Sequence, residues 1–248
     1  MNEYVHDGIV GCPDTQADYW ELQHFDDNCA PTAEASIIKQ FGYDYDQDQF
    51  AYISAANGWY SPGGGTSPED IGNMMDLFNI PNHTVQNAGV ADLIAELSQG
   101  HGVIVGVRSE QLWDQGLLAE LKNFVVRKAG LDTSEWNPAD HAIVVTGMDF
   151  SDPSNPMVLV NDSGEPGGQA HAYPLDRFVD AWQNSDFYYT ATNNPLPSMA
   201  HDTSMLASFN WNSLHADWDN FTGHGSTVQP VLFIDEDFFM NEEFLRII

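Results

Sequence analysis

The feature of this sequence that most constrains its fold is a helix that begins at a cysteine. Asn28 and Asp27 are residue types that cap helices, and Pro31 suits a first turn. Before Gly42, apolar residues recur at helical spacing: Ala33, Ile37, Ile38 and Phe41. The pattern therefore places the thiol of Cys29 at the N-terminus of this helix.

A thiol in that position has the surroundings of a reactive cysteine. The partial positive charge of the helix end favours thiolate over thiol, and the unpaired backbone N–H groups can hold a developing oxyanion. The alternative is that Cys29 packs as a small, inert apolar side chain, as many buried cysteines do. A base elsewhere in the chain decides between the two interpretations.

A base and an acid come from two later segments. The β-branched run 141–150 and the run 157–162 flank a turn rich in Ser, Asp and Pro, which predicts an antiparallel hairpin. Pairing carried outward from the turn puts His141 opposite Asp162. A carboxylate that accepts from one imidazole nitrogen fixes the tautomer while the other nitrogen faces the thiol. Taken alone, His141 would be an ordinary histidine at a strand end.

Gln23 supplies a fourth group. It precedes Cys29 by six residues, just before the capping turn. There its amide could join the backbone N–H of Cys29 in an oxyanion hole. By itself Gln23 would be an ordinary surface amide, so the interpretation depends on the joint pattern.

This order of Gln, Cys, His and Asp resembles the papain-like cysteine peptidases, and more narrowly the stand-alone relatives of the bacteriocin-processing, double-glycine peptidases. The matching segments are WELQHFDDNCAPTAEASIIKQFG, GGGTSPEDIGNMMDLFNI, HAIVVTGMDF, VNDSGEPGG and YPLDRFVDAW. The resemblance implies that Cys29 is the nucleophile, His141 the base, Asp162 the orienting acid and Gln23 the oxyanion amide. It also implies peptide-bond hydrolysis through a thioester acyl-enzyme, with no cofactor.

Two other functions use the same residues differently. The acyl group could pass to an amine rather than to water, which is acyltransferase or transglutaminase-like chemistry. Alternatively, the chain could be a non-catalytic module that binds a peptide or protein and retains the fold.

The rest of the sequence predicts an α+β, papain-like fold, with a helical half first, an antiparallel sheet later and the site between them. Helices are predicted at 67–78, 91–98, 111–128 and 175–182, and further strands at 102–109 and 187–192. We divide the chain into an N-terminal extension 1–18, a peptidase domain 19–192 and a C-terminal extension 193–248. Five residues are predicted to pack in the interior, namely Met74, Met75, Trp113, Trp136 and Trp182, and Trp136 could also shield the site from water.

Charge narrows the set of partners. The 37 acidic side chains against 7 basic ones give a formal net charge of −30, which disfavours nucleic acid and anionic membranes. A peptide or protein substrate of basic character fits such a surface better. The C-terminal extension offers an aromatic cluster for a protein partner, with core packing as the alternative: Phe238, Phe239, Phe244 and Leu245.

Several other motifs are absent or incomplete. There is no apolar run long enough to cross a membrane and no signal-peptide pattern, so a cytoplasmic location is expected. Two cysteines do not make a disulfide framework. Asp44, Asp46 and Asp48 imitate a calcium loop, but Gln49 and Ala55 replace its Gly and Glu. The histidines lack the paired spacing of a zinc site, so no metal is expected.

Overall fold

The computed structural model describes residues 4–6, 8–113 and 139–197. Within these ranges, helices are combined with one large antiparallel sheet, which confirms the predicted α+β class. Three predicted features lie outside the described residues: Trp136, positions 114–128 of the helix predicted at 111–128, and positions 198–248 with the Phe238 cluster.

The large sheet has eight strands, and its main path follows the order β1-β2-β7-β6-β10-β5. Strand β8 pairs with β7 and with β9. The strand bounds are β1 Val5–His6, β2 Ile9–Gly11, β5 Asn82–Val85, β6 Val103–Val107, β7 His141–Asp149, β8 Met157–Asn161, β9 His171–Pro174 and β10 Tyr189–Thr192. Two short strands form a separate hairpin, β3 Tyr60–Ser61 and β4 Gly65–Thr66.

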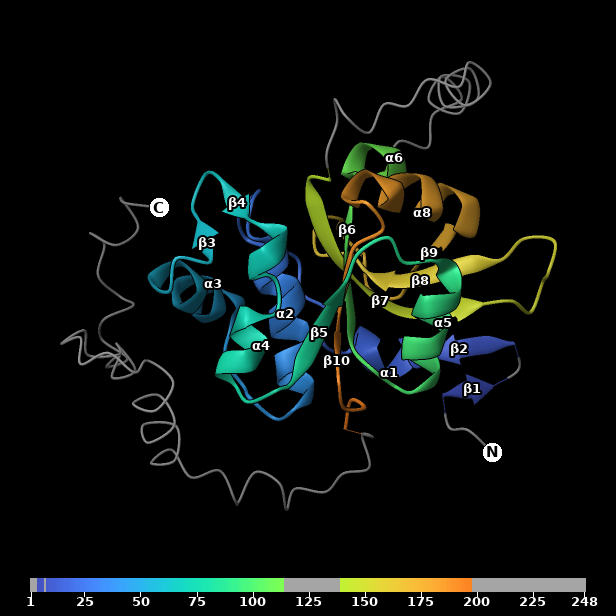
Figure 1. Ribbon diagram of the computed structural model, residues 1–248, viewed down its shortest axis with the longest axis horizontal. Helices are drawn as coiled ribbons and strands as arrows, with labels where there is room; N and C mark the ends of the chain where they lie inside the picture. Colours follow the sequence, from blue (N-terminus) through green and yellow to red (C-terminus); the bar gives the residue numbers. More distant parts are fainter. Residues whose placement is uncertain (1–3, 7, 114–138, 198–248) are drawn as a thin grey trace. The chain divides into compact units, whose positions relative to one another are not determined.

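Helices cover the sheet (Figure 1), with α2, α3 and α4 gathered together and α6 lying beside α8. Their bounds are α1 Pro13–Ala17, α2 Cys29–Gln40, α3 Gln47–Ala56, α4 Asn73–Leu77, α5 Val90–Ser98, α6 Ser109–Trp113 and α8 Leu175–Trp182, with short 3₁₀ turns η1 Pro68–Asp70 and η3 Gln183–Ser185. In the described part of the chain, no helix has the length and apolar character needed to cross a bilayer.

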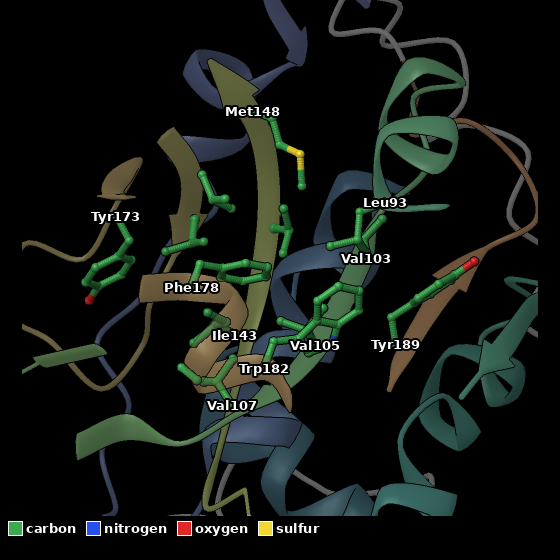
Figure 2. Packing of buried hydrophobic residues seen from close by; sticks show 14 of the residues in the cluster. Leu93, Val103, Val105, Val107, Ile143, Met148, Tyr173, Phe178, Trp182 and Tyr189 are labelled. Atoms are coloured by element: carbon green, nitrogen blue, oxygen red, sulfur yellow. The ribbon is translucent and has the colours of Figure 1, made fainter. Parts of the chain in front are cut away.

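Two hydrophobic clusters pack on opposite faces of the sheet. In β6, Val103, Val105 and Val107 belong to one cluster and Ile104 to the other, as the alternation of side chains along a strand requires. Figure 2 shows the first cluster, where Phe178 and Trp182 of α8 pack with strand residues. The second cluster lies under α2, α3 and α4 and contains the fully buried Met74 and Met75. The packing predictions for Met74, Met75 and Trp182 are therefore confirmed.

The helix predicted at 67–78 is interrupted. Gly72 separates η1 from α4 and has a positive φ of 108°. A Cβ atom at this position would lie 2.4 Å from Oδ1 of Asn82, so the close approach favours glycine. The N–H of Gly72 donates to Oε1 of the buried Glu34 on α2, at 2.9 Å, rather than continuing a helix. A long-range contact thus overrides the local helical pattern.

One of the aspartates that imitate a calcium loop, Asp46, has a structural role. Asp46 is the N-cap of α3, and its Oδ1 accepts from the N–H of Gln49 at 2.8 Å. The side chain of Gln49 accepts in return from the N–H of Asp46, which completes a capping box. This pair therefore explains the local pattern without an ion.

Candidate active site

Cys29 is the first residue of α2, as predicted, but neither neighbouring side chain caps the helix. Oδ1 of the fully buried Asn28 accepts from the N–H of Phe25 at 3.2 Å. The carboxylate of Asp27 accepts from the hydroxyl of Tyr60 at 2.7 Å and from the N–H of Gly63. Asn28 is thus the N-cap residue by position, as predicted, but these contacts engage both side chains and neither caps the helix. Asp27 instead fastens the β3–β4 hairpin to the segment that precedes Cys29.

His141 begins β7, and the predicted hairpin of β7 with β8 is present. The predicted register is wrong. The ladder starts with Asp149 opposite Met157, shifts between Val145 and Gly147 and ends with Val144 opposite Asn161, so Asp162 does not lie opposite His141. Asp162 follows the last residue of β8 and is therefore outside the ladder. The two side chains nevertheless meet, with Nε2 of His141 2.7 Å from Oδ1 of Asp162. The nitrogen donates, since an ionised carboxylate can only accept.

The carboxylate of Asp162 is fully buried and accepts four hydrogen bonds. Oδ1 accepts from His141 and from the N–H of Gly164, at 2.7 and 3.0 Å. Oδ2 accepts from the indole N–H of Trp113 at 2.8 Å and from the hydroxyl of Tyr173 at 3.1 Å. These donors replace the water that the carboxylate loses on burial.

The same contacts set the charges of the pair. Burial lowers the pKa of His141, but hydrogen bonds to Asp162 and Cys29, and the charges of both, raise it to about 10. Burial raises the pKa of Asp162, whereas the hydrogen bond and charge of His141 and the donors Trp113 and Gly164 bring it below its usual value. Imidazolium and carboxylate are therefore the favoured forms at neutral pH. Because Nε2 faces Asp162, Nδ1 is the ring nitrogen available to Cys29.

Gln23 lies beside the residue that follows Asp162. The N–H of Gln23 donates to the carbonyl of Ser163 at 2.8 Å, and the hydroxyl of Ser163 donates to Oε1 of Gln23 at 3.1 Å. One N–H of the Gln23 amide goes to the carbonyl of Phe25 at 2.7 Å. The amide nitrogen carries a second hydrogen that could reach a substrate.

Three residues of this site were not predicted from the sequence: Trp113, Tyr173 and Gly164. The rings of Trp113 and His141 are 5.2 Å apart and meet edge to face. A Cβ atom on Gly164 would lie 2.6 Å from the Trp113 ring and 3.0 Å from Cε1 of His141. Trp113 was predicted only to pack, and the one available signal was that a buried indole N–H usually needs a partner.

No metal site is found in residues 4–6, 8–113 and 139–197, where no cluster of three or more His, Cys, Asp or Glu side chains could hold an ion. Cys12 and Cys29 are not joined in a disulfide. The groups that do come together are a thiol, an imidazole and a carboxylate. They have the chemistry of a nucleophile, a base and an orienting acid.

One family model and several known proteins match this chain. The model of the Peptidase_C39 like family matches residues 15–190. Two uncharacterized proteins, one from Mycobacterium bovis and one from Mycobacterium tuberculosis, are each 30% identical over 212 residues, which covers 74% of this chain and 84% of each relative.

Two solved structures are also similar. A Bacillus anthracis protein described as a C39-like peptidase is 12% identical, with a TM-score of 0.48, over 71% of this chain and 94% of the other. The peptidase domain of Streptococcus ComA is 16% identical, with a TM-score of 0.46, over 71% and 97%. Because the family model matches well over half of the sequence, in a stretch that contains Cys29, His141 and Asp162, this chain belongs to the C39-like peptidase family.

Proposed function

We propose that this protein is a cysteine peptidase that hydrolyses peptide bonds through a thioester acyl-enzyme. The observation that carries the proposal is the buried His141–Asp162 hydrogen bond, with the imidazole also in contact with Cys29 at the start of α2. In this proposal Cys29 is the nucleophile, His141 the general base and acid, and Asp162 the orienting acid. The family supports a peptide or protein substrate.

In the proposed reaction, His141 carries the proton while the thioester forms and is then hydrolysed. The thiolate of Cys29 attacks the carbonyl carbon, and the proton taken from the thiol stays on Nδ1 of His141. His141 then gives that proton to the leaving amine as the C–N bond breaks, which leaves a thioester. Water attacks the thioester with His141 as base. The carboxylic acid product leaves, and the thiol of Cys29 is regenerated.

The proposed oxyanion hole consists of the backbone N–H of Cys29 and the amide of Gln23. Cys29 supports it because the first N–H groups of a helix have no partner within the helix. Gln23 supports it through its attachment to Ser163, directly after Asp162, and through its second amide hydrogen. We propose residues 19–192 as the catalytic domain.

We also propose that the substrate has basic character. The support is the net charge of −30, which attracts cationic peptides and repels anionic ones at low ionic strength. Cleavage of matched Lys-rich and Glu-rich peptides at two salt concentrations tests this point. A preference for the Lys-rich peptide that shrinks as salt rises is the expected result.

The first test of the peptidase proposal is chemical. A thiol-directed peptide inhibitor should modify Cys29 of the full chain and leave Cys12 unmodified, because Cys29 begins α2 and contacts the protonated imidazole of His141. Peptide mapping by mass spectrometry distinguishes the two thiols. Equal modification of both, or modification of Cys12 alone, contradicts the proposal.

A second test concerns Trp113 as a positioning residue. Trp113→Phe removes the donor to Oδ2 of Asp162 and keeps a ring beside His141. A hydrogen bond to a charged group contributes about 1.5–3 kcal/mol, so we expect kcat to fall about tenfold or more with KM little changed. Tyr173→Phe removes the other donor to the same oxygen and is the matched comparison. A lower melting temperature with unchanged kcat would show that Trp113 only packs.

A further inference from the structure

A second cavity lies away from the candidate active site. Its volume is about 120 Å³, and its walls include Cys12, Gln16, Gln40, Leu97, His101 and Leu196. Gln40 is the last residue of α2, so the cavity is at the opposite end of this helix from Cys29, about 16 Å along its axis. Figure 1 shows α1 and α5 near β2, and residues of all three elements line the cavity.

Gln16 lines the cavity and has an unused hydrogen-bonding group. The residue is only 3% exposed, and its Oε1 atom is buried without a hydrogen-bond partner. Its main chain is firmly held, since its N–H donates to the carbonyl of Cys12 at 3.1 Å and its carbonyl accepts from Nδ2 of Asn161 at 2.7 Å. A buried acceptor without a partner costs about 1–3 kcal/mol. A donor brought by an occupant of the cavity would remove this cost.

The other walls define the shape and polarity of that occupant. Leu97 and Leu196 are apolar and buried, and His101 is held in place by Glu96, whose Oε2 is 2.6 Å from its Nδ1. The volume is well above the roughly 10–15 Å³ that a cavity needs to hold a single water molecule. The occupant is thus a compact molecule with one polar end and a short apolar body.

We propose that this cavity binds a small aliphatic carboxamide, with its N–H donating to Oε1 of Gln16. An amide N–H satisfies the acceptor without bringing a charge. A carboxylate would have no hydrogen to donate and would be repelled by the net charge of −30. An ammonium group would lose its hydration against the apolar walls. A carboxamide also carries both a donor and an acceptor, so it complements either orientation of the Gln16 amide.

Cys12 makes the proposal measurable, because its side chain is partly exposed and lines the cavity. The experiment uses the full chain with Cys29→Ala, so that Cys12 is the only thiol, and methyl methanethiosulfonate as a small reagent without an amide. Propionamide is the probe, and butanone, which has the same size and shape but no N–H, is the control. Binding is measured independently of catalysis, so failure here leaves the peptidase proposal untouched.

We expect propionamide to slow the labelling of Cys12 at least tenfold at saturation, with half-protection at millimolar concentration, while butanone gives less than twofold protection. Gln16→Met removes the acceptor at similar length and should abolish the difference between the two compounds. Saturation-transfer NMR of the two probes with the unmodified chain gives the same comparison without the thiol and without a variant. Equal effects of both compounds would overturn the proposal. So would no effect of either compound up to about 0.1 M, since the cavity would then hold only water.

Discussion

Replacing Cys29 by Ala is expected to lower the kcat/KM of peptide cleavage by at least about 10⁴-fold. Removing the nucleophile of a catalytic triad typically costs this much or more, and what remains comes from the oxyanion hole and substrate binding. The alanine side chain is smaller than the thiol, and residue 29 begins α2 without a side-chain cap. The substitution should therefore leave the fold and substrate binding intact.

The matched control is Cys12→Ala. Cys12 lies outside the candidate site, next to α1, and its replacement should change kcat/KM less than twofold. Cleavage of a peptide library followed by mass spectrometry measures the parent and both variants side by side. If the Cys29→Ala protein cleaves at a comparable rate while Cys12→Ala does not, the nucleophile has been assigned to the wrong cysteine. If neither variant differs from an inactive parent, the chain is a binding module.

Added amines separate hydrolysis from acyl transfer in the same assay. In both reactions Cys29 forms the thioester, and the difference is whether water or an amine attacks it. If the enzyme is a hydrolase, the products are carboxylic acids at low amine concentration, and amide products form only when the amine is concentrated enough to compete with water. Dominant amide products at low amine concentration would favour the acyltransferase interpretation instead.

Local signals predicted those parts of the fold that depend on nearby residues. The helix at Cys29, the amphipathic helix Leu175–Trp182 and the β7–β8 hairpin were all expected from apolar spacing and turn residues. The break at Gly72 was not, because its cause is Glu34 on a different helix. Nothing in residues 67–78 alone indicates that a buried side chain of another helix takes the N–H on which a continuous helix would depend.

In the candidate site, too, residues with a local sequence signal were predicted and residues placed by distant contacts were not. Cys29, His141 and Asp162 could be proposed because each has a local signal, a helix start or a strand end, and because family resemblance supplies the combination. Trp113 and Tyr173 have no such signal. Their role depends on Oδ2 of Asp162, which the β7–β8 irregularity and the turn after β8 bring toward α6 and β9. Sequence patterns do not specify side-chain direction at this precision.

Replacing Asp162 by Asn is expected to lower kcat/KM by about 10²–10⁴-fold with little change in KM. An amide fits the same space but has a single oxygen. If its NH₂ group takes the place of Oδ1, it cannot accept from His141, and in either orientation the imidazole loses the negative charge that stabilises its charged form. If the NH₂ group instead takes the place of Oδ2, the donors Trp113 and Tyr173 lose their acceptor. The loss should therefore be in the chemical step.

The pH profile distinguishes this role from a structural one. The pKa of His141 is raised to about 10, so the imidazolium present below the unfolded value of about 6.5 persists in the folded protein until the pH rises through about 10. In Asp162→Asn the largest source of that increase is gone, and burial then favours the neutral ring. The alkaline limb of kcat/KM should move to lower pH, and the stability that the charged His141 provides should be lost at lower pH as well. A uniform loss of activity with an unshifted alkaline limb would contradict the role assigned to Asp162, and Tyr173→Phe, which keeps the carboxylate, should leave the limb nearly in place.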